Sequence, residues 1–218
     1  MSSIQISLPY THTEADLAAA YVRQSNRRSG ADFMIMRKSI DARKKHDIRI
    51  VYQLLPADKK PPLDGVAGLT CSFEAIDTSR FRKADNSRRL VVVGAGPAGL
   101  FAALFLALTG CKPLLIERGQ PVEQRQLDVA RFWQSGKLDP ESNVQFGEGG
   151  AGTFSDGKLT TGIRDPRCTA VLEELVLLGA PPEILYLSKP HIGTDRLREV
   201  MIALRHKIIS LGGEVRYG

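Results

Sequence analysis

The stretch Gly94-Ala95-Gly96-Pro97-Ala98-Gly99 decides the fold of this 218-residue sequence. Directly before it, Arg89 to Val93 is a short β-branched run of the kind that forms a buried parallel strand. Directly after it, the apolar segment Ala98 to Leu108 predicts a helix that ends at Gly110. A second strand is predicted over Pro113 to Glu117. Strand, glycine-rich turn, helix and strand within about 30 residues predict a right-handed βαβ unit.

The spacing of the glycines indicates what this turn binds. Gly94 permits a tight turn off the strand, Gly96 removes the side chain where a pyrophosphate approaches the backbone, and Gly99 lets the helix pack closely. The unpaired N–H groups and partial positive charge of the helix N-terminus then stabilise the diphosphate. Pro97 suits an early helical position, because the N–H that it lacks would be unsatisfied there. The turn therefore predicts a dinucleotide site.

An acidic residue at the end of the second strand narrows the choice of dinucleotide. Glu117 lies 18 residues after Gly99, where a carboxylate can accept hydrogen bonds from ribose hydroxyls. An acid at this position argues against a 2′-phosphate, and hence against NADP at this site. FAD and NAD remain, so an NAD-dependent dehydrogenase is the first alternative; it predicts NADH binding without a bound chromophore.

Two further stretches carry a resemblance to a known family. They are Glu117-Arg118-Gly119 followed by Arg125, and the glycine-rich segment from Asn143 to Leu159. Together with Val91 to Leu100 they resemble FAD-dependent oxidoreductases of the glutathione-reductase-like superfamily. More narrowly, the chain is similar to a bacterial family usually called uncharacterised FAD-dependent dehydrogenases, in which a small α/β domain precedes the flavin domain. The resemblance covers nearly the whole chain, including Lys189 to Asp195.

The resemblance implies an FAD that runs from Glu117, at its adenosine ribose, past the glycine turn to the second glycine-rich segment, where its flavin end lies. NAD(P)H is a candidate co-substrate. The glycines of the second segment leave room for a large planar ring, and its hydroxyl groups supply the few polar contacts that such a site uses. The basic side chains after Glu117 are expected to approach the diphosphate. The candidate cofactor-binding residues are therefore Gly94, Gly96, Pro97, Ala98, Gly99, Glu117, Arg118, Arg125, Gly149, Gly150, Thr153 and Ser155.

The expected chemistry is hydride transfer, in which the flavin supplies the reactivity and the protein supplies binding, orientation and electrostatics. The sequence leaves the catalytic residues unknown. His191 is a candidate acid or base, and Lys158 a candidate for stabilising a reduced, anionic ring. Cys168 has no second cysteine nearby, which argues against a disulfide-reductase mechanism.

The front of the chain predicts a separate unit. Ile4 to Leu8 alternates like a strand, and Thr13 to Ser25 forms an amphipathic helix that begins with a capping box of Thr13 and Asp16. Two more strands are predicted over Asp32 to Met36 and Asp47 to Leu54. We therefore expect a small α/β domain, ferredoxin-like in arrangement.

The predicted domain boundary lies near residue 88, after a proline-rich linker or crossing segment that runs to Asn86. Residues 1–88 form the small basic α/β domain plus linker, and residues 89–218 form a Rossmann-like FAD-binding domain. Within the second domain, helices are predicted over Arg167 to Leu178 and after an N-cap at Asp195. The sequence stops on the strand that begins at Glu214 and lacks the second Gly-Asp-type motif of the superfamily, so we expect an N-terminal fragment with an incomplete flavin domain, inactive alone.

The net charge of +6 is concentrated in residues 1–88, which carry net +5. A basic front domain leaves a second alternative open, an RNA-associated flavoprotein. Only Phe33 and Tyr52 flank the basic run, so there is little aromatic surface for base stacking and nucleic acid is an unlikely partner.

The three cysteines, Cys71, Cys111 and Cys168, include no C-x-x-C pair, which predicts no disulfide framework, no metal site and a reduced compartment. The longest unbroken apolar stretch lies within Leu100 to Leu108 and is far shorter than the roughly 20 residues that span a bilayer. A cytoplasmic protein without membrane association is the expectation; the substrate and the electron carrier are not specified by the sequence.

Overall fold

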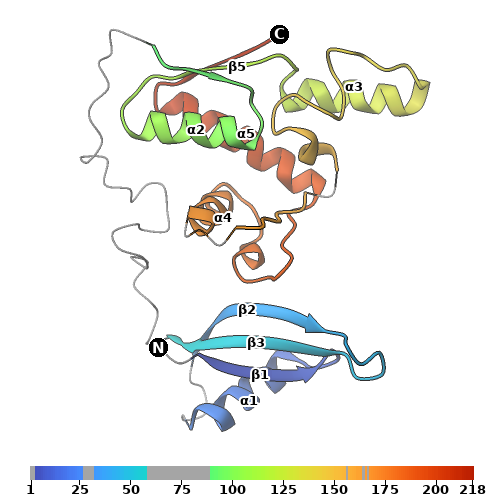
Figure 1. Cartoon of the computed structure of the whole chain (residues 1–218), viewed down its shortest axis with the longest axis vertical. Coiled ribbons are helices and arrows are strands. Elements are labelled where there is room, and N and C mark those ends of the chain that lie inside the picture. The colour runs from blue at the N-terminus through green and yellow to red at the C-terminus, as the bar shows by residue number, and fades with distance from the viewer. Residues whose placement is uncertain (1–2, 27–31, 58–88, 156, 164, 166) are drawn as a thin grey trace. The chain divides into compact units, whose positions relative to one another are not determined.

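A computed structural model describes residues 3–26, 32–57, 89–155, 157–163, 165 and 167–218 (Figure 1). The chain divides into two compact units. Unit 1 comprises residues 1–68 together with 182–190, and unit 2 comprises residues 69–181 together with 191–218. The predicted linker began at Pro56, which the structure instead places at the end of a strand. The rest of the linker from residue 58 and the boundary near residue 88 lie outside the described residues. The structure groups residues 182–190 with the first unit, whereas the sequence assigned them to the second.

Unit 1 is a three-stranded antiparallel sheet with one α-helix packed on it. Its elements are β1 (Ile4–Pro9), α1 (Glu14–Ser25), β2 (Phe33–Asp41) and β3 (Arg49–Pro56). The sheet order is β1-β3-β2, so the last strand lies between the first two and runs antiparallel to both. This is the split βαβ arrangement found in half of a ferredoxin-like fold. The second α-helix and fourth strand that would complete that fold are absent from the described residues of this unit.

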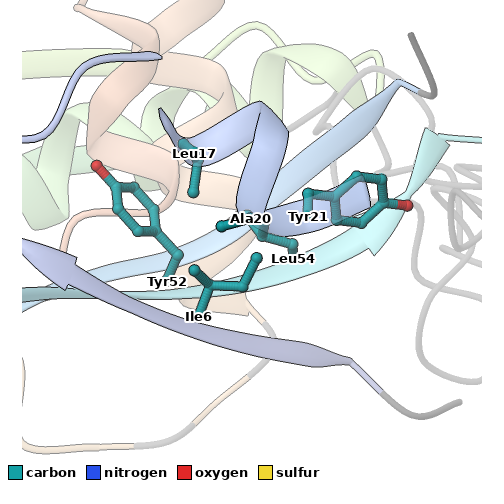
Figure 2. Packing of buried hydrophobic residues seen from close by; sticks show 6 residues of the cluster. All are labelled: Ile6, Leu17, Ala20, Tyr21, Tyr52 and Leu54. Atoms are coloured by element: carbon teal, nitrogen blue, oxygen red, sulfur yellow. The ribbon is translucent and has the colours of Figure 1, made fainter. Parts of the chain in front are cut away.

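Helix α1 is held by its cap and by its apolar face. The predicted capping box is confirmed: the Thr13 hydroxyl accepts from the Asp16 N–H at 3.2 Å, and the Asp16 carboxylate accepts from the Thr13 N–H at 2.8 Å. Side chains from the helix and the sheet then form one core (Figure 2). Its buried members are Ile6, Leu17, Ala20, Tyr21, Tyr52 and Leu54.

Strand β2 is longer than predicted. The prediction ended at Met36, but the strand continues to Asp41. The reason is a β-bulge between Ile35 and Arg37, where the pairing with β3 shifts register. The bulge interrupts the alternation of apolar and polar residues, so the sequence pattern stops there. Pairing nevertheless continues beyond it, with Ile40 opposite Ile50.

The 182–190 segment belongs to unit 1 because it pairs with β2. The Lys38 N–H donates to the Tyr186 carbonyl at 2.8 Å, and the Ser188 N–H donates to the Lys38 carbonyl at 3.1 Å. Together these bonds form an isolated parallel bridge between Lys38 and Leu187. A short distant segment therefore satisfies part of the edge of β2.

Unit 2 contains a parallel sheet in the order β4-β5-β6. The predicted sequence of strand, glycine turn, helix and parallel strand is present as β4, α2 and β5. Helices α2 and α5 pack against each other and against the sheet (Figure 1). The elements are β4 (Val91–Val93), α2 (Pro97–Leu108), β5 (Leu114–Glu117), α3 (Val122–Ser135), the 3-10 helix η4 (Ala151–Phe154), α4 (Arg167–Leu177), α5 (Thr194–Ser210) and β6 (Glu214–Tyr217).

Helix α5 buries the predicted apolar stripe, but its start differs from the prediction. Asp195 was expected to be the N-cap. Instead the N-cap is Gly193, without any side-chain cap, and Asp195 lies inside the first turn and forms an ion pair with Arg198. The prediction was wrong because Gly193 adopts a positive φ of 85°, which lets the helix begin earlier than the acidic residue.

Within the described parts of the chain, the helices are all too short or too polar to cross a lipid bilayer.

The core of unit 1 gives a first test. Leu54 is fully buried on the central strand, so Leu54→Ala should lower the free energy of opening β3 by about 2–5 kcal/mol, through lost burial and an unfilled cavity. Amide hydrogen exchange read out on peptides of residues 49–56 measures this directly. Ile40→Ala on the neighbouring strand is the control, because Ile40 is 71% exposed and should change the opening energy little. Equal effects of the two substitutions would contradict the packing described.

Candidate functional site

The glycine turn lies at the carboxyl end of β4, and its glycines have different physical roles. Gly94 has φ of +93°, a left-handed conformation that other residues rarely adopt. A Cβ on Gly99 would lie 1.8 Å from the Gly94 carbonyl oxygen, so only glycine lets α2 begin against the turn. At Gly96, by contrast, a Cβ would meet no atom within 4 Å. Gly99 is thus required by the protein itself, and the space at Gly96 is open.

Helix α2 begins directly from this turn. Gly96 is its N-cap, Pro97 is in the first turn, and the Leu100 N–H donates to the Gly96 carbonyl at 3.0 Å. The first N–H groups of a helix have no partner within the helix, and here no side chain caps them. This end of α2 therefore presents free donors and a partial positive charge.

Glu117 connects the turn to the end of β5. Its carboxylate is buried and accepts two backbone hydrogen bonds, from the Ala95 N–H at 2.6 Å and from the Gly119 N–H at 2.8 Å. A carboxylate has about four lone-pair sites, so two such bonds leave acceptor capacity. The predicted ribose-binding residue thus also fixes the shape of the turn.

The second glycine-rich segment packs onto the first. The Gly149 N–H donates to the Ala95 carbonyl at 2.8 Å, and a Cβ on Gly150 would lie 3.3 Å from Cδ of Pro97. Gly149 and Gly150 both have positive φ, 78° and 69°. The two glycine motifs, which are about 50 residues apart in sequence, thus form one continuous structure.

The two predicted hydroxyl groups of this segment differ in accessibility. Thr153 is fully buried, and its hydroxyl donates to the Glu148 carbonyl at 3.4 Å. Ser155 is exposed, and its hydroxyl donates to the Gly152 carbonyl at 3.4 Å. Thr153 therefore supports the segment from inside, and Ser155 is accessible to a ligand.

Arg125 holds the second segment in place. Its guanidinium is completely buried and donates to the carbonyls of Asn143, Glu148 and Gly150 at 2.8–2.9 Å. It also lies over the Phe154 ring at 4.7 Å. Burial lowers the pKa of Arg125 to about 10, against the opposing effect of nearby carboxylates. Its Nη2 atom is buried and has no hydrogen-bond partner among the described residues.

Arg118 is placed differently from Arg125. It is exposed, stacks over the Phe146 ring at 3.9 Å and lies 4.0 Å from the Glu141 carboxylate. The structure does not bring it to the glycine turn. The predicted pair of arginines therefore separates into one buried residue at the second glycine segment and one surface residue.

An apolar cavity of about 340 Å³ adjoins the first turn of α2. Its walls come from α2, from the glycine-rich segment through residue 159, and from α4 and α5. The lining residues are Pro97, Ala98, Phe101, Gly149, Gly152, Gly157, Lys158, Leu159, Val171, Leu175, Leu197 and Met201. A largely apolar cavity with few polar groups is the usual form of a small-molecule or cofactor site.

The residues considered for catalysis lie around this region without forming a catalytic set. His191 is exposed and forms an antiparallel bridge with Lys158, while Cys168 is a free, half-buried cysteine on α4. Among the described residues there is no cluster of His, Cys, Asp and Glu side chains suited to a metal ion.

Sequence reasoning missed a buried ionic cluster beside the site. The carboxylate of Glu148, which is fully buried, accepts from the Val122 N–H at the start of α3 at 2.8 Å and from Arg205 of α5 at 3.0 Å. Arg205 also pairs with Glu123 and donates to the Tyr217 hydroxyl at 3.4 Å. The cluster thus ties α3, α5, β6 and the glycine-rich segment together.

Burial and pairing act in opposite directions within this cluster. Burial raises the pKa of the Glu148 carboxyl, against the lowering effects of the Val122 N–H and Arg205. Burial also raises the pKa of Tyr217, reinforced by the negative charge of Glu148. For Arg205, burial favours the neutral form, but the hydrogen bonds to Glu123 and Tyr217 raise its pKa overall. The Val122 N–H and the Arg205 guanidinium therefore both oppose the effect of burial on the Glu148 carboxyl.

Comparison with known proteins bears on both units. Residues 88–126 match the FAD binding domain family. This match supports a flavin-dependent oxidoreductase family and points to FAD binding. Residues 1–55 match a domain of unknown function (DUF8436).

The chain is also similar to a longer protein. It is 50% identical over 188 residues to a protein of Clostridium beijerinckii (strain ATCC 51743 / NCIMB 8052) described as "Uncharacterized protein". The alignment covers 84% of this chain and 35% of the relative, so the chain spans about a third of that relative's length.

The ionic cluster can be tested by removing its cation. Arg205→Met leaves the buried Glu148 without its cationic partner and should destabilise unit 2 by about 3–5 kcal/mol near neutral pH. The loss should shrink on acidification. Without Arg205 the folded-state pKa of Glu148 lies still further above its unfolded value, so stability falls as pH rises through that folded pKa.

Urea unfolding followed by far-UV circular dichroism, at about pH 5 and about pH 8, measures both effects. The control is the double variant Glu148→Gln with Arg205→Met, which removes both charges and should be less destabilised and less sensitive to pH than the single variant. A single variant with the same deficit at both pH values would show that Glu148 does not depend on Arg205.

Proposed function

We propose that unit 2 binds FAD, with the diphosphate at the N-terminus of α2 and the adenosine ribose at Glu117. The observation that carries this proposal is the contrast between two glycines of one turn. The contact with Gly94 requires glycine at position 99, but no atom of the described residues would contact a Cβ at Gly96. A diphosphate bound at the N-terminus of α2 would occupy this space, which a side chain at position 96 would block.

Three other features fit the same group. Glu117 retains acceptor capacity for ribose hydroxyls. Arg125 keeps Nη2, a buried donor without a partner among the described residues. The cavity beside Ala98 offers a flat ring walls that are mostly apolar. The residues present therefore suit FAD, and we assign the ring to this cavity.

As a whole, we propose that the protein is an FAD-dependent oxidoreductase of the dehydrogenase type. Bound FAD would supply hydride-transfer chemistry. The chain's own residues would bind the diphosphate, hold the ribose, shape the segment at residues 147–154 and shield the ring. The buried fold of that segment, fixed by Arg125 and Glu148, makes the site preorganised.

The two glycines provide the test. Gly96 has φ of −69°, which suits any residue, so Gly96→Val should leave the far-UV circular dichroism spectrum unchanged but weaken FAD binding at least about tenfold. Gly99→Ala should instead lower stability, because its Cβ would collide with the Gly94 carbonyl. Gly162→Ala is the matched control, since its Cβ meets no atom within 4 Å and it lies outside the cavity lining.

FAD binding is measured by the quenching of flavin fluorescence on titration with protein, and NADH is titrated in parallel. Folded Gly96→Val protein that binds FAD as tightly as the parent would refute the diphosphate assignment. A parent protein that binds NADH but no FAD would replace the flavin proposal by an NAD-dependent dehydrogenase.

A further inference from the structure

One end of the sheet in unit 1, where β2 connects to β3, carries large apolar side chains that α1 leaves uncovered. Ile40 pairs opposite Ile50, which in turn pairs opposite Leu8, so the three side chains lie on one face of the sheet. Ile50 and Leu8 pack against the core that includes α1, which identifies this face as the one that carries the helix. Ile40 is nevertheless 71% exposed. The helix therefore does not cover this end of the sheet.

Tyr10 adds an aromatic side chain to the same end. It directly follows β1, and its N–H donates to the carbonyl of Ile48, the residue before β3 begins, at 3.1 Å. Tyr10 is 65% exposed. Tyr10 and Ile40 are 30 positions apart in sequence, so only the pairing of the strands shows that they share one end of the sheet.

Positive charge is concentrated at this end of the sheet. Residues 37–49 contain six Lys and Arg residues but only two aspartates. The aspartates form ion pairs with Arg43 and Arg49, at 2.6 and 3.4 Å. Lys44 and Lys45 are exposed and form no ion pair with any of the described residues. The connection between β2 and β3, which projects beyond the sheet, thus presents both lysines to solvent (Figure 1).

We propose that Tyr10, Ile40, Lys44 and Lys45 form a docking tip for the surface of an anionic phospholipid bilayer. The two lysines pair with the anionic headgroups, and the two large side chains enter the boundary between headgroups and acyl chains. Binding of this kind is peripheral and needs no membrane-spanning helix. The inference concerns unit 1 by itself and does not depend on FAD binding.

The chemistry of the docking tip disfavours the other partners of a basic surface. Base stacking needs exposed aromatic rings, but Tyr52 is buried in the core of unit 1 and Phe33 packs against that core. A second copy of the chain would bring like charges together. A protein partner would need a concave surface to receive a projecting tip, whereas a fluid bilayer surface needs no matching shape. Headgroup charge and an apolar layer beneath it therefore match both halves of the tip.

Binding is measured by co-sedimentation of the whole chain with vesicles, either of phosphatidylcholine alone or with about one third phosphatidylserine. The parent protein should bind the anionic vesicles far more tightly than the neutral ones. Lys44→Ala combined with Lys45→Ala should weaken this binding at least about tenfold, because each basic residue near the surface contributes separately. Lys112→Ala combined with Lys137→Ala removes the same charge from exposed positions of unit 2 and should have little effect.

Ile40→Ala tests insertion, because electrostatic adsorption alone does not depend on this side chain. It should weaken binding to anionic vesicles about tenfold through lost apolar burial. Leu177→Ala, at a 60% exposed position of α4, is the matched control. As a second measurement, Tyr10→Trp combined with Trp133→Phe moves the single tryptophan of the chain to the docking tip. Its emission should then shift to shorter wavelength when anionic vesicles are added.

A parent protein that does not bind anionic vesicles would overturn the inference. Equal losses in the tip variants and their controls would overturn it as well, because another surface would then hold the bilayer. Binding that needs the lysines but is unchanged in Ile40→Ala, without a shift in tryptophan emission, would reduce the tip to a charged patch without insertion. Transfer RNA is titrated in parallel, and tighter binding to RNA that depends on the same lysines would assign the tip to nucleic acid instead.

Discussion

The contact between the Gly94 carbonyl and Gly99 is the constraint on which unit 2 depends. It brings the first turn of α2 against the end of β4, and no side chain larger than hydrogen fits between them. Ala95, held in the same turn, then uses both of its backbone groups: its N–H donates to Glu117 and its carbonyl accepts from Gly149. One tight turn thus sets the positions of the second strand's end and of the second glycine-rich segment.

The features that could be predicted from the sequence depend on local geometry. The order of strand, turn, helix and strand around Gly94 to Gly99 follows from residue types at fixed spacing, and the structure shows it with parallel strands. The capping box of Thr13 and Asp16 is likewise a local pattern, and both of its hydrogen bonds are present. The apolar stripe of α5 was predicted because burial of one helix face repeats at a known period.

The features that escaped prediction depend on contacts between distant segments. A bulge near Met36 breaks the alternation of inward and outward side chains in β2. The strand beyond the bulge could be recognised only from its pairing with β3. Arg205 lies next to the apolar stripe of α5, and its burial is explained by Glu148, 57 residues away. Arg125 was expected to approach a diphosphate, but three of its hydrogen bonds go to backbone carbonyls. The available sequence signal was Glu148 between two glycines and Arg205 directly after Leu204 of the apolar stripe.

The double role of Glu117 has a consequence for how this site is understood. Because its carboxylate already accepts from Ala95 and Gly119, replacing it would loosen the turn as well as remove a ribose contact, and lost binding could not be assigned to either cause. Gly96 differs, since a Cβ at this position would lie within 4 Å of no atom of the described residues. A diphosphate site of this form contains both kinds of residue. Residues such as Glu117 shape the turn, whereas the small size of Gly96 matters only for a bound ligand.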